Sequence, residues 1–225
     1  MFCYAKLFKG AGIIGNMKKK DLIIIVPGSN FRGSKKKTIK RIIVYLYSLV
    51  HIFRLIYYNY AKLWTKKLDK KGRKLIWLHW SRGITQLSIF FAVKKLNNLI
   101  KQYKNRYNIK LVGISLGGEI IQEAANKFDD DSIKKIILVC STNEHKKTNL
   151  KTKIVNIYSS YDIFAKLSSI ILNPIHGGTV LSGENVKNID LPKFTHHEFC
   201  EDAKIKKGKY KGKTITNLID YFLDN

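Results

Sequence analysis

Residues 113–118 read Gly-Ile-Ser-Leu-Gly-Gly and stand between two segments of opposite character. Residues 107–112, directly before them, are rich in β-branched and other strand-forming side chains, which predicts a strand. Residues 119–128, directly after them, place apolar side chains at helical spacing, which predicts a helix. Ser115 therefore lies on a sharp turn from a strand into a helix. Only small residues fit where a strand and a helix pass so close together, which accounts for the glycines on either side of it.

A turn of this kind holds a serine in a strained backbone, with its hydroxyl pointing out above the sheet. The backbone N–H of Leu116 then lies at a helix N-terminus, where it can stabilise developing negative charge. The sequence thus predicts that Ser115 is the nucleophile of a serine hydrolase. The plainer interpretation, that Ser115 only caps the next helix, is disfavoured by the preceding strand and the second glycine.

A nucleophilic serine needs a base, and the base needs an acid that orients it. Asp162 follows the strand-like residues 153–158, so we expect it at the same edge of the sheet as Ser115. The next strand-like segment leads to His196 and His197, which are the candidate bases.

Alternatives remain open for both partners. Asp162 is also suited to begin the helix expected over residues 163–171, and Asp190 and Glu184 are substitute acids, although both lie within or before the last strand. His197 is the alternative to His196 as the base.

Residues 23–31, Ile-Ile-Ile-Val-Pro-Gly-Ser-Asn-Phe, resemble the strand and oxyanion loop that open the core of α/β-hydrolases of the lipase and esterase kind. Family members often carry His-Gly or Pro-Gly after this strand, and here Pro27-Gly28 takes that place, without the histidine. The resemblance implies that the backbone N–H of Ser29 or Asn30 joins that of Leu116 in an oxyanion hole.

Residues 196–199, His-His-Glu-Phe, are similar to the family pattern His-x-Asp/Glu-Leu/Phe around the catalytic histidine, which favours His196 over His197. The chain order of serine, aspartate and histidine also matches the family. The resemblance implies hydrolysis of a small-molecule carboxylic ester or lipid through an acyl-enzyme, with no cofactor. The sequence leaves open whether the substrate is an ester, a thioester or a lipid. A non-catalytic membrane- or partner-binding protein that retains the fold stays the alternative.

Strand-like and helix-like segments alternate from residue 18 onward, which predicts one domain over residues 18–225 with a mainly parallel sheet. The fold class is α/β, a compact α/β-hydrolase fold with helices on both faces of the sheet. Strands are expected over residues 21–26, 75–80, 109–114, 134–140, 153–158 and 186–191. Helices are expected over residues 38–66, 84–105, 117–128, 163–171 and 213–224.

The N-terminal residues 1–17 are expected to form a tail outside this domain, and Met17 is an alternative start of the protein. Residues 10–15, Gly-Ala-Gly-Ile-Ile-Gly, match a dinucleotide-binding pattern, but a strand follows too soon for the helix that such a site requires. The three cysteines are widely spaced and form no disulfide framework, so we expect a reducing, cytoplasmic environment.

The formal net charge of +26 comes mainly from lysines that are spread through the chain rather than gathered in one stripe. Nucleic-acid binding is therefore not expected, and peripheral contact with an anionic membrane fits the charge better. The plainer explanation of the positive charge is an AT-rich genome, which would impose abundant lysine on any protein.

Residues 42–64 are apolar almost all round. This pattern fits a helix packed on the sheet, or a helix that lines an acyl pocket or docks on a membrane. Residues 196–202 hold metal-ligand types without a metal-site spacing, so we expect no metal.

Overall fold

The computed structural model describes residues 19–28, 64–69, 72–80, 86–128, 131–141, 148–162 and 180–225. Within these ranges six strands form one sheet in the order β2-β1-β3-β4-β5-β6, and every pair of neighbours is parallel. The strands are β1 (Lys20–Val26), β2 (Arg73–Trp77), β3 (Tyr107–Ile114), β4 (Ile133–Val139), β5 (Ile154–Tyr158) and β6 (Val186–Asp190). The expected α/β class and the six strands are confirmed.

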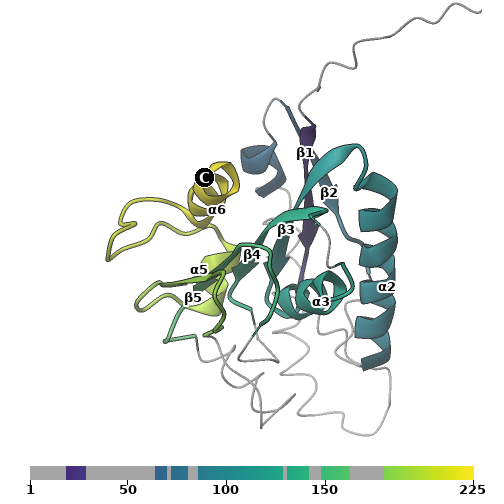
Figure 1. Cartoon of the computed structure of the whole chain (residues 1–225). Coiled ribbons are helices and arrows are strands. Elements are labelled where there is room, and N and C mark those ends of the chain that lie inside the picture. The colour runs from purple at the N-terminus through teal and green to yellow at the C-terminus, as the bar shows by residue number, and fades with distance from the viewer. Residues whose placement is uncertain are drawn as a thin grey trace, which may run out of the picture.

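Helices cover both faces of this sheet, because each face carries its own buried apolar layer. The helices α2 (Gln86–Tyr103) and α3 (Leu116–Ala125) lie on one side, and α5 (His196–Cys200) and α6 (Ile215–Asp224) lie on the other (Figure 1). Residues 64–68 are also helical. None of the helices in the described ranges is both long and apolar enough to span a bilayer. The expected tail, the helix over residues 163–171 and most of the helix over residues 38–66 lie outside those ranges.

The interior of β1 explains why the sheet is covered on both faces. Residues 22–26, Leu-Ile-Ile-Ile-Val, are all 0% exposed, so successive side chains are buried on opposite faces of the strand. A continuous apolar run of this kind is typical of a central strand in a parallel sheet.

The order of the strands places a reversal next to β1. After β1 the chain adds β2 on one side of it, and then crosses to add β3 on the other side. At such a reversal in a parallel sheet, the loops that follow two neighbouring strands run in opposite directions. They leave a crevice at the carboxyl edge of the sheet, and ligands bind there. Val26 and Gly113 are paired at this point, so the turn at Ser115 lies at the reversal.

One strand ends earlier than the sequence predicts. The strand expected over residues 75–80 ends at Trp77, although the N–H of Leu78 still donates to the carbonyl of Ile25 at 2.9 Å. Beyond it the chain turns over the end of β1, where the indole N–H of Trp80 donates to the carbonyl of Pro27 at 3.0 Å. The polar group of this tryptophan thus ties the loop after β2 to the loop after β1.

Candidate active site

Ser115 occupies the turn between β3 and α3 in a backbone conformation that side chains rarely adopt, with φ 52° and ψ −127°. Its N–H donates to the carbonyl of Val139 at 2.9 Å, and its carbonyl accepts from the N–H of Gly118 at 2.9 Å. These two bonds hold the strained residue from both sides. Leu116 is the first residue of α3, and the N–H groups of a first helical turn have no partner within their own helix.

The glycines around Ser115 are required by close approach of the backbone. A Cβ on Gly117 would lie 2.0 Å from the carbonyl oxygen of Val26, a distance that no packing adjustment accommodates. A Cβ on Gly28 would lie 2.9 Å from the Cβ of Ser115 and 3.4 Å from its Oγ. The expectation that only small residues fit here is confirmed, and the loop after β1 passes directly against the serine. Ser29 and Asn30, the other expected oxyanion donors, lie outside the described residues.

Asp162 and His196 meet at the same edge of the sheet. The Nδ1 of His196 lies 2.9 Å from the Oδ2 of Asp162, and the Asp162 side chain is only 1% exposed while that of His196 is 21% exposed. A buried carboxylate on Nδ1 orients the imidazole and leaves Nε2 as the nitrogen that can exchange a proton with another group.

The substitute acids lie elsewhere. Asp190 is exposed, and its Oδ1 accepts from the backbone N–H of Ser160 at 3.1 Å. That bond steadies the turn that carries Asp162, whose N–H donates to the carbonyl of Ser159 at 3.1 Å. Glu184 is exposed and precedes β6. The geometry therefore joins His196 to Asp162 rather than to either alternative.

A series of backbone hydrogen bonds aligns the loops at the carboxyl edge. The N–H of Ser115 bonds to β4, the N–H of Cys140 donates to the carbonyl of Ile157 in β5 at 2.9 Å, and the N–H of Leu191 donates to the carbonyl of Tyr158 at 2.8 Å. Each bond fixes the residue that follows one strand against the end of a neighbouring strand. The turns that carry the serine, the aspartate and the approach to the histidine are thus set in register by the sheet itself.

His196 opens a short helix that the sequence did not predict. The Thr195 hydroxyl caps the N–H of Glu198, and the Glu198 carboxylate accepts from the N–H of Thr195 at 2.8 Å, which is a capping box. The rings of Phe194 and Phe199 are buried and pack edge to face, with centroids 4.9 Å apart. Five residues form a helix here because both ends of it are anchored. The sequence feature that could have predicted this helix is the Thr-x-x-Glu spacing of residues 195–198, which is typical of a capping box.

His197, the alternative base, points along the same helix toward Glu201. Its Nδ1 lies 3.0 Å from the Glu201 carboxylate, and its side chain is 42% exposed. Consecutive residues of a helix point in different directions, so only one of the two histidines can reach Asp162.

Cys140 also lies at this site, although its sequence context did not indicate a place there. Its sulfur, the Asp162 carboxylate and a ring nitrogen of His196 all lie within 4.8 Å of one another. Burial, together with the nearby Cys200 and Asp162, raises the pKa of the Cys140 thiol well above its usual value. Burial and the neighbouring carboxylates of Asp162 and Glu201 likewise raise the pKa of Cys200 to about 12. Both thiols therefore stay neutral and place no second charge beside Asp162.

These side chains are ligand types that zinc accepts, but the site fits proton transfer better than a metal. A metal would require the Cys140 thiolate, which burial disfavours, and it would displace the hydrogen bond between Asp162 and His196. Asp202, another acid near the histidines, accepts from the N–H of Thr216 at 2.6 Å and from its hydroxyl at 2.7 Å, and it pairs with Lys67. That carboxylate holds three segments together, which is a structural role.

Comparisons with known proteins agree with this fold. A model of the alpha/beta hydrolase family matches residues 43–174. Est1E from Butyrivibrio proteoclasticus is similar in structure, with a TM-score of 0.51 and 14% identity over 92% of this chain and 88% of that one. A bromoperoxidase from Bacillus anthracis has a TM-score of 0.56 and 10% identity over 92% of this chain and 93% of that one. No curated protein matches the sequence.

Proposed function

The chain belongs to the alpha/beta hydrolase family, and from its site we propose that it is a serine hydrolase that cleaves a carboxylic ester through an acyl-enzyme. The fold alone does not select the reaction, since a bromoperoxidase has the same architecture. One observation carries the proposal: Ser115, held in a strained backbone, lies at the same sheet edge as a histidine bound to a buried carboxylate.

In the first step the Oγ of Ser115 attacks the carbonyl carbon of the ester while the Nε2 of His196 takes the hydroxyl proton. Asp162 accepts the hydrogen bond from Nδ1 and stabilises the imidazolium that forms. The backbone N–H of Leu116, at the start of α3, donates to the oxyanion of the tetrahedral intermediate. The alkoxide then leaves as an alcohol with the proton from His196, and the acyl group remains on Ser115.

In the second step His196 takes a proton from water as the water oxygen attacks the acyl carbon. The bond between that carbon and the Ser115 oxygen breaks, and His196 returns its proton to the serine. The products are a carboxylic acid and the free enzyme, so the reaction consumes one water and needs no cofactor.

Cys140 is the alternative nucleophile, because its sulfur lies close to Asp162 and His196. Its chemistry makes it a poorer nucleophile than Ser115. A thiol attacks as the thiolate, and burial keeps the pKa of Cys140 well above neutral pH. The Cys140 side chain is also 1% exposed, whereas Ser115 is only partly buried. We assign attack to Ser115 for these reasons.

The test is labelling with a fluorophosphonate probe, which reacts with activated serines, followed by peptide mass spectrometry. Wild-type protein should be labelled at Ser115, and Ser115→Ala and His196→Ala should not be labelled. Cys140→Ser is the matched control and should keep the label on Ser115. Absence of labelling in folded wild-type protein would favour a non-catalytic binding protein with this fold.

The substrate class follows from rates on p-nitrophenyl esters of graded acyl length. Preference for short chains would make the protein a small esterase, and preference for long chains would support an acyl pocket. Thioesters of the same acyl groups form the parallel series, because the proposed mechanism also applies to them.

A further inference from the structure

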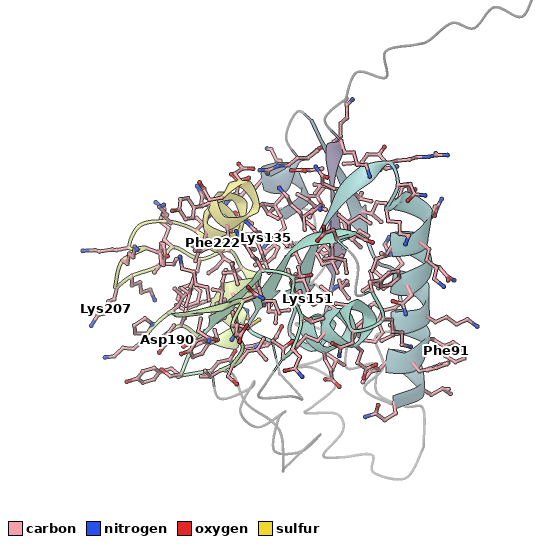
Figure 2. The ribbon with its side chains drawn as sticks, viewed as in Figure 1. Phe91, Lys135, Lys151, Asp190, Lys207 and Phe222 are labelled. Carbon is pink, nitrogen blue, oxygen red and sulfur yellow. The ribbon has the colours of Figure 1, made fainter. Side chains whose placement is uncertain are left out.

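The outer face of α2 carries three exposed apolar side chains in its first two turns. Leu87 is 65% exposed, and Phe90 and Phe91 are each 56% exposed. The two phenylalanine rings pack edge to face with centroids 5.7 Å apart, so they form one apolar surface rather than two separate side chains. Figure 2 shows Phe91 on the outer side of α2, pointing away from the sheet. A patch of this size, roughly 300 Å², is at the lower end of those that commonly have a function.

Lysines continue the same face toward the end of the helix. Leu87, Phe91, Lys94, Asn98 and Lys101 follow one another at spacings of three and four residues, which places them along one stripe. All five are exposed. The opposite stripe is buried against the protein core and consists of Ile89, Ala92, Val93, Leu96 and Ile100. The outer face of α2 is therefore apolar at its beginning and basic at its end.

The apolar end of this face is at the same edge of the sheet as the candidate active site. Both α2 and α3 follow a strand of the parallel sheet, so both helices begin at its carboxyl edge. The two helices pack against each other on the same side of the sheet, with axes typically about 10 Å apart. Leu87 in the first turn of α2 is thus at the level of Ser115, which precedes α3.

We propose that this face of α2, consisting of Leu87, Phe90, Phe91, Lys94 and Lys101, docks on the surface of an anionic lipid bilayer. Phenylalanine and leucine enter the boundary between headgroups and acyl chains, and lysines on the same surface bind anionic headgroups. The formal net charge of +26 complements such a surface and brings the protein to it. A consequence that rests on the proposed function is that esters within a bilayer reach Ser115 more readily than esters in solution.

Sedimentation with lipid vesicles tests the docking directly. Wild-type protein should bind vesicles of phosphatidylglycerol and phosphatidylcholine at least about tenfold more tightly than vesicles of phosphatidylcholine alone, and salt should weaken the binding steeply. The triple variant Leu87→Gln, Phe90→Gln, Phe91→Gln should bind at least about tenfold more weakly. Glutamine is a good helix former, and far-ultraviolet circular dichroism checks that α2 remains folded. The single variant Tyr221→Gln, an exposed aromatic on α6, should bind like wild type.

A pair of charge variants separates this face from net charge alone. Lys94→Glu with Lys101→Glu should weaken binding about tenfold or more, since each lysine near an anionic surface contributes on the order of 1 kcal/mol. Lys207→Glu with Lys211→Glu changes the net charge equally on an exposed loop, and Figure 2 shows Lys207 on the side of the molecule away from Phe91. This control should bind within about twofold of wild type. Equal losses in both variants would overturn the proposal.

Two further outcomes would also overturn it. Unchanged binding by the triple glutamine variant would show that the apolar side chains do not enter the bilayer. A wild-type dimer in light scattering that the triple variant converts to a monomer would assign the face to a second copy of this chain. Vesicle binding needs no catalysis, so Ser115→Ala should bind like wild type. Failure to hydrolyse any ester would count against the proposed function and leave the docking result intact.

Discussion

Ser115 has a strained backbone and also carries the hydroxyl that we propose as the nucleophile. Its φ of 52° and ψ of −127° are tolerated by glycine and cost a residue with a Cβ about 1–3 kcal/mol. The hydrogen bonds to Val139 and from Gly118 hold the turn in place despite that cost. A strained serine that the surrounding backbone keeps in position is already oriented before a substrate arrives.

Two substitutions of Ser115 separate the strain from the hydroxyl. Both Ser115→Ala and Ser115→Gly should abolish ester hydrolysis, because both remove Oγ. The free energy of unfolding of Ser115→Gly should exceed that of Ser115→Ala by about 1 kcal/mol, after the greater chain entropy of glycine is subtracted. Ser115→Gly should therefore unfold at the higher temperature. Thermal unfolding followed by circular dichroism measures the difference. A lower melting temperature for the glycine variant would mean that the turn is not strained.

The two neighbouring histidines should differ sharply in their effect on turnover. His196→Ala removes the proposed base, which is bound to Asp162, so kcat should fall by at least about a thousandfold. His197→Ala removes only an exposed pair with Glu201, and kcat should stay within about threefold of wild type. Steady-state kinetics on a soluble ester measures both values of kcat. A larger loss of kcat in His197→Ala than in His196→Ala would mean that His197 is the base.

At the scale of elements, α5 is the helix whose stability positions His196, the proposed base. It has five residues, too few to be stable alone, and it depends on its capping box and on the buried rings beside it. Burial tends to raise the pKa of Glu198, but hydrogen bonds from Lys206 and Thr195 outweigh it, so the pKa lies below its usual value. The ionised carboxylate therefore stabilises the folded state above the ordinary carboxyl pKa. That stabilisation is lost as the pH falls through the lowered value.

Glu198→Gln should reveal this contribution, because glutamine can keep the bond to the N–H of Thr195 but carries no charge. We expect its melting temperature to be about 2 °C below that of wild type near neutral pH. The gap should narrow as the pH falls from neutral through and below the ordinary carboxyl range, because the wild-type carboxylate then takes up a proton. Glu184→Gln is the control for net charge, and its gap should be smaller. A gap that widens in acid would contradict the proposed ion pair with Lys206.

At the scale of the whole molecule, the excess of positive charge opposes folding. Lysine and arginine number 42 against 16 acidic residues, and most of the lysines in the described ranges are exposed. Like charges repel more strongly in the compact state than in the unfolded chain. Ion pairs such as those of Arg73 with Asp220 and Asp224 offset only part of this repulsion.

Salt should therefore stabilise this protein. Raising sodium chloride from about 0.05 M to about 0.5 M shortens the screening length, and the melting temperature should rise by several degrees. The variant Lys207→Glu with Lys211→Glu should melt higher than wild type at low salt and show a smaller response. Differential scanning fluorimetry gives both numbers. A fall in melting temperature with salt would show that attractive pairs dominate the electrostatics.

Local pattern was sufficient for much of the fold. Continuous apolar runs and helical spacing predicted all six strands, and the helices α2, α3 and α6 within a few residues. The turn at Ser115 was predictable because its strand, glycines and helix are consecutive in the chain. The short helix α5 was missed, since five residues are too few for a periodic pattern to show.

The meeting of distant residues was decided only by tertiary structure. Asp162 and His196 are 34 positions apart, and their contact depends on the register of β5 and β6 and on the direction in which α5 presents each histidine. The sequence offered two histidines and three acids, and packing selected one of each. Cys140 entered the site because β4 lies beside both β3 and β5. Sequence by itself determined the elements and the turn at Ser115, because those rest on neighbours along the chain. Strand order and burial determined which side chains share the site, because those depend on contacts that no local pattern encodes.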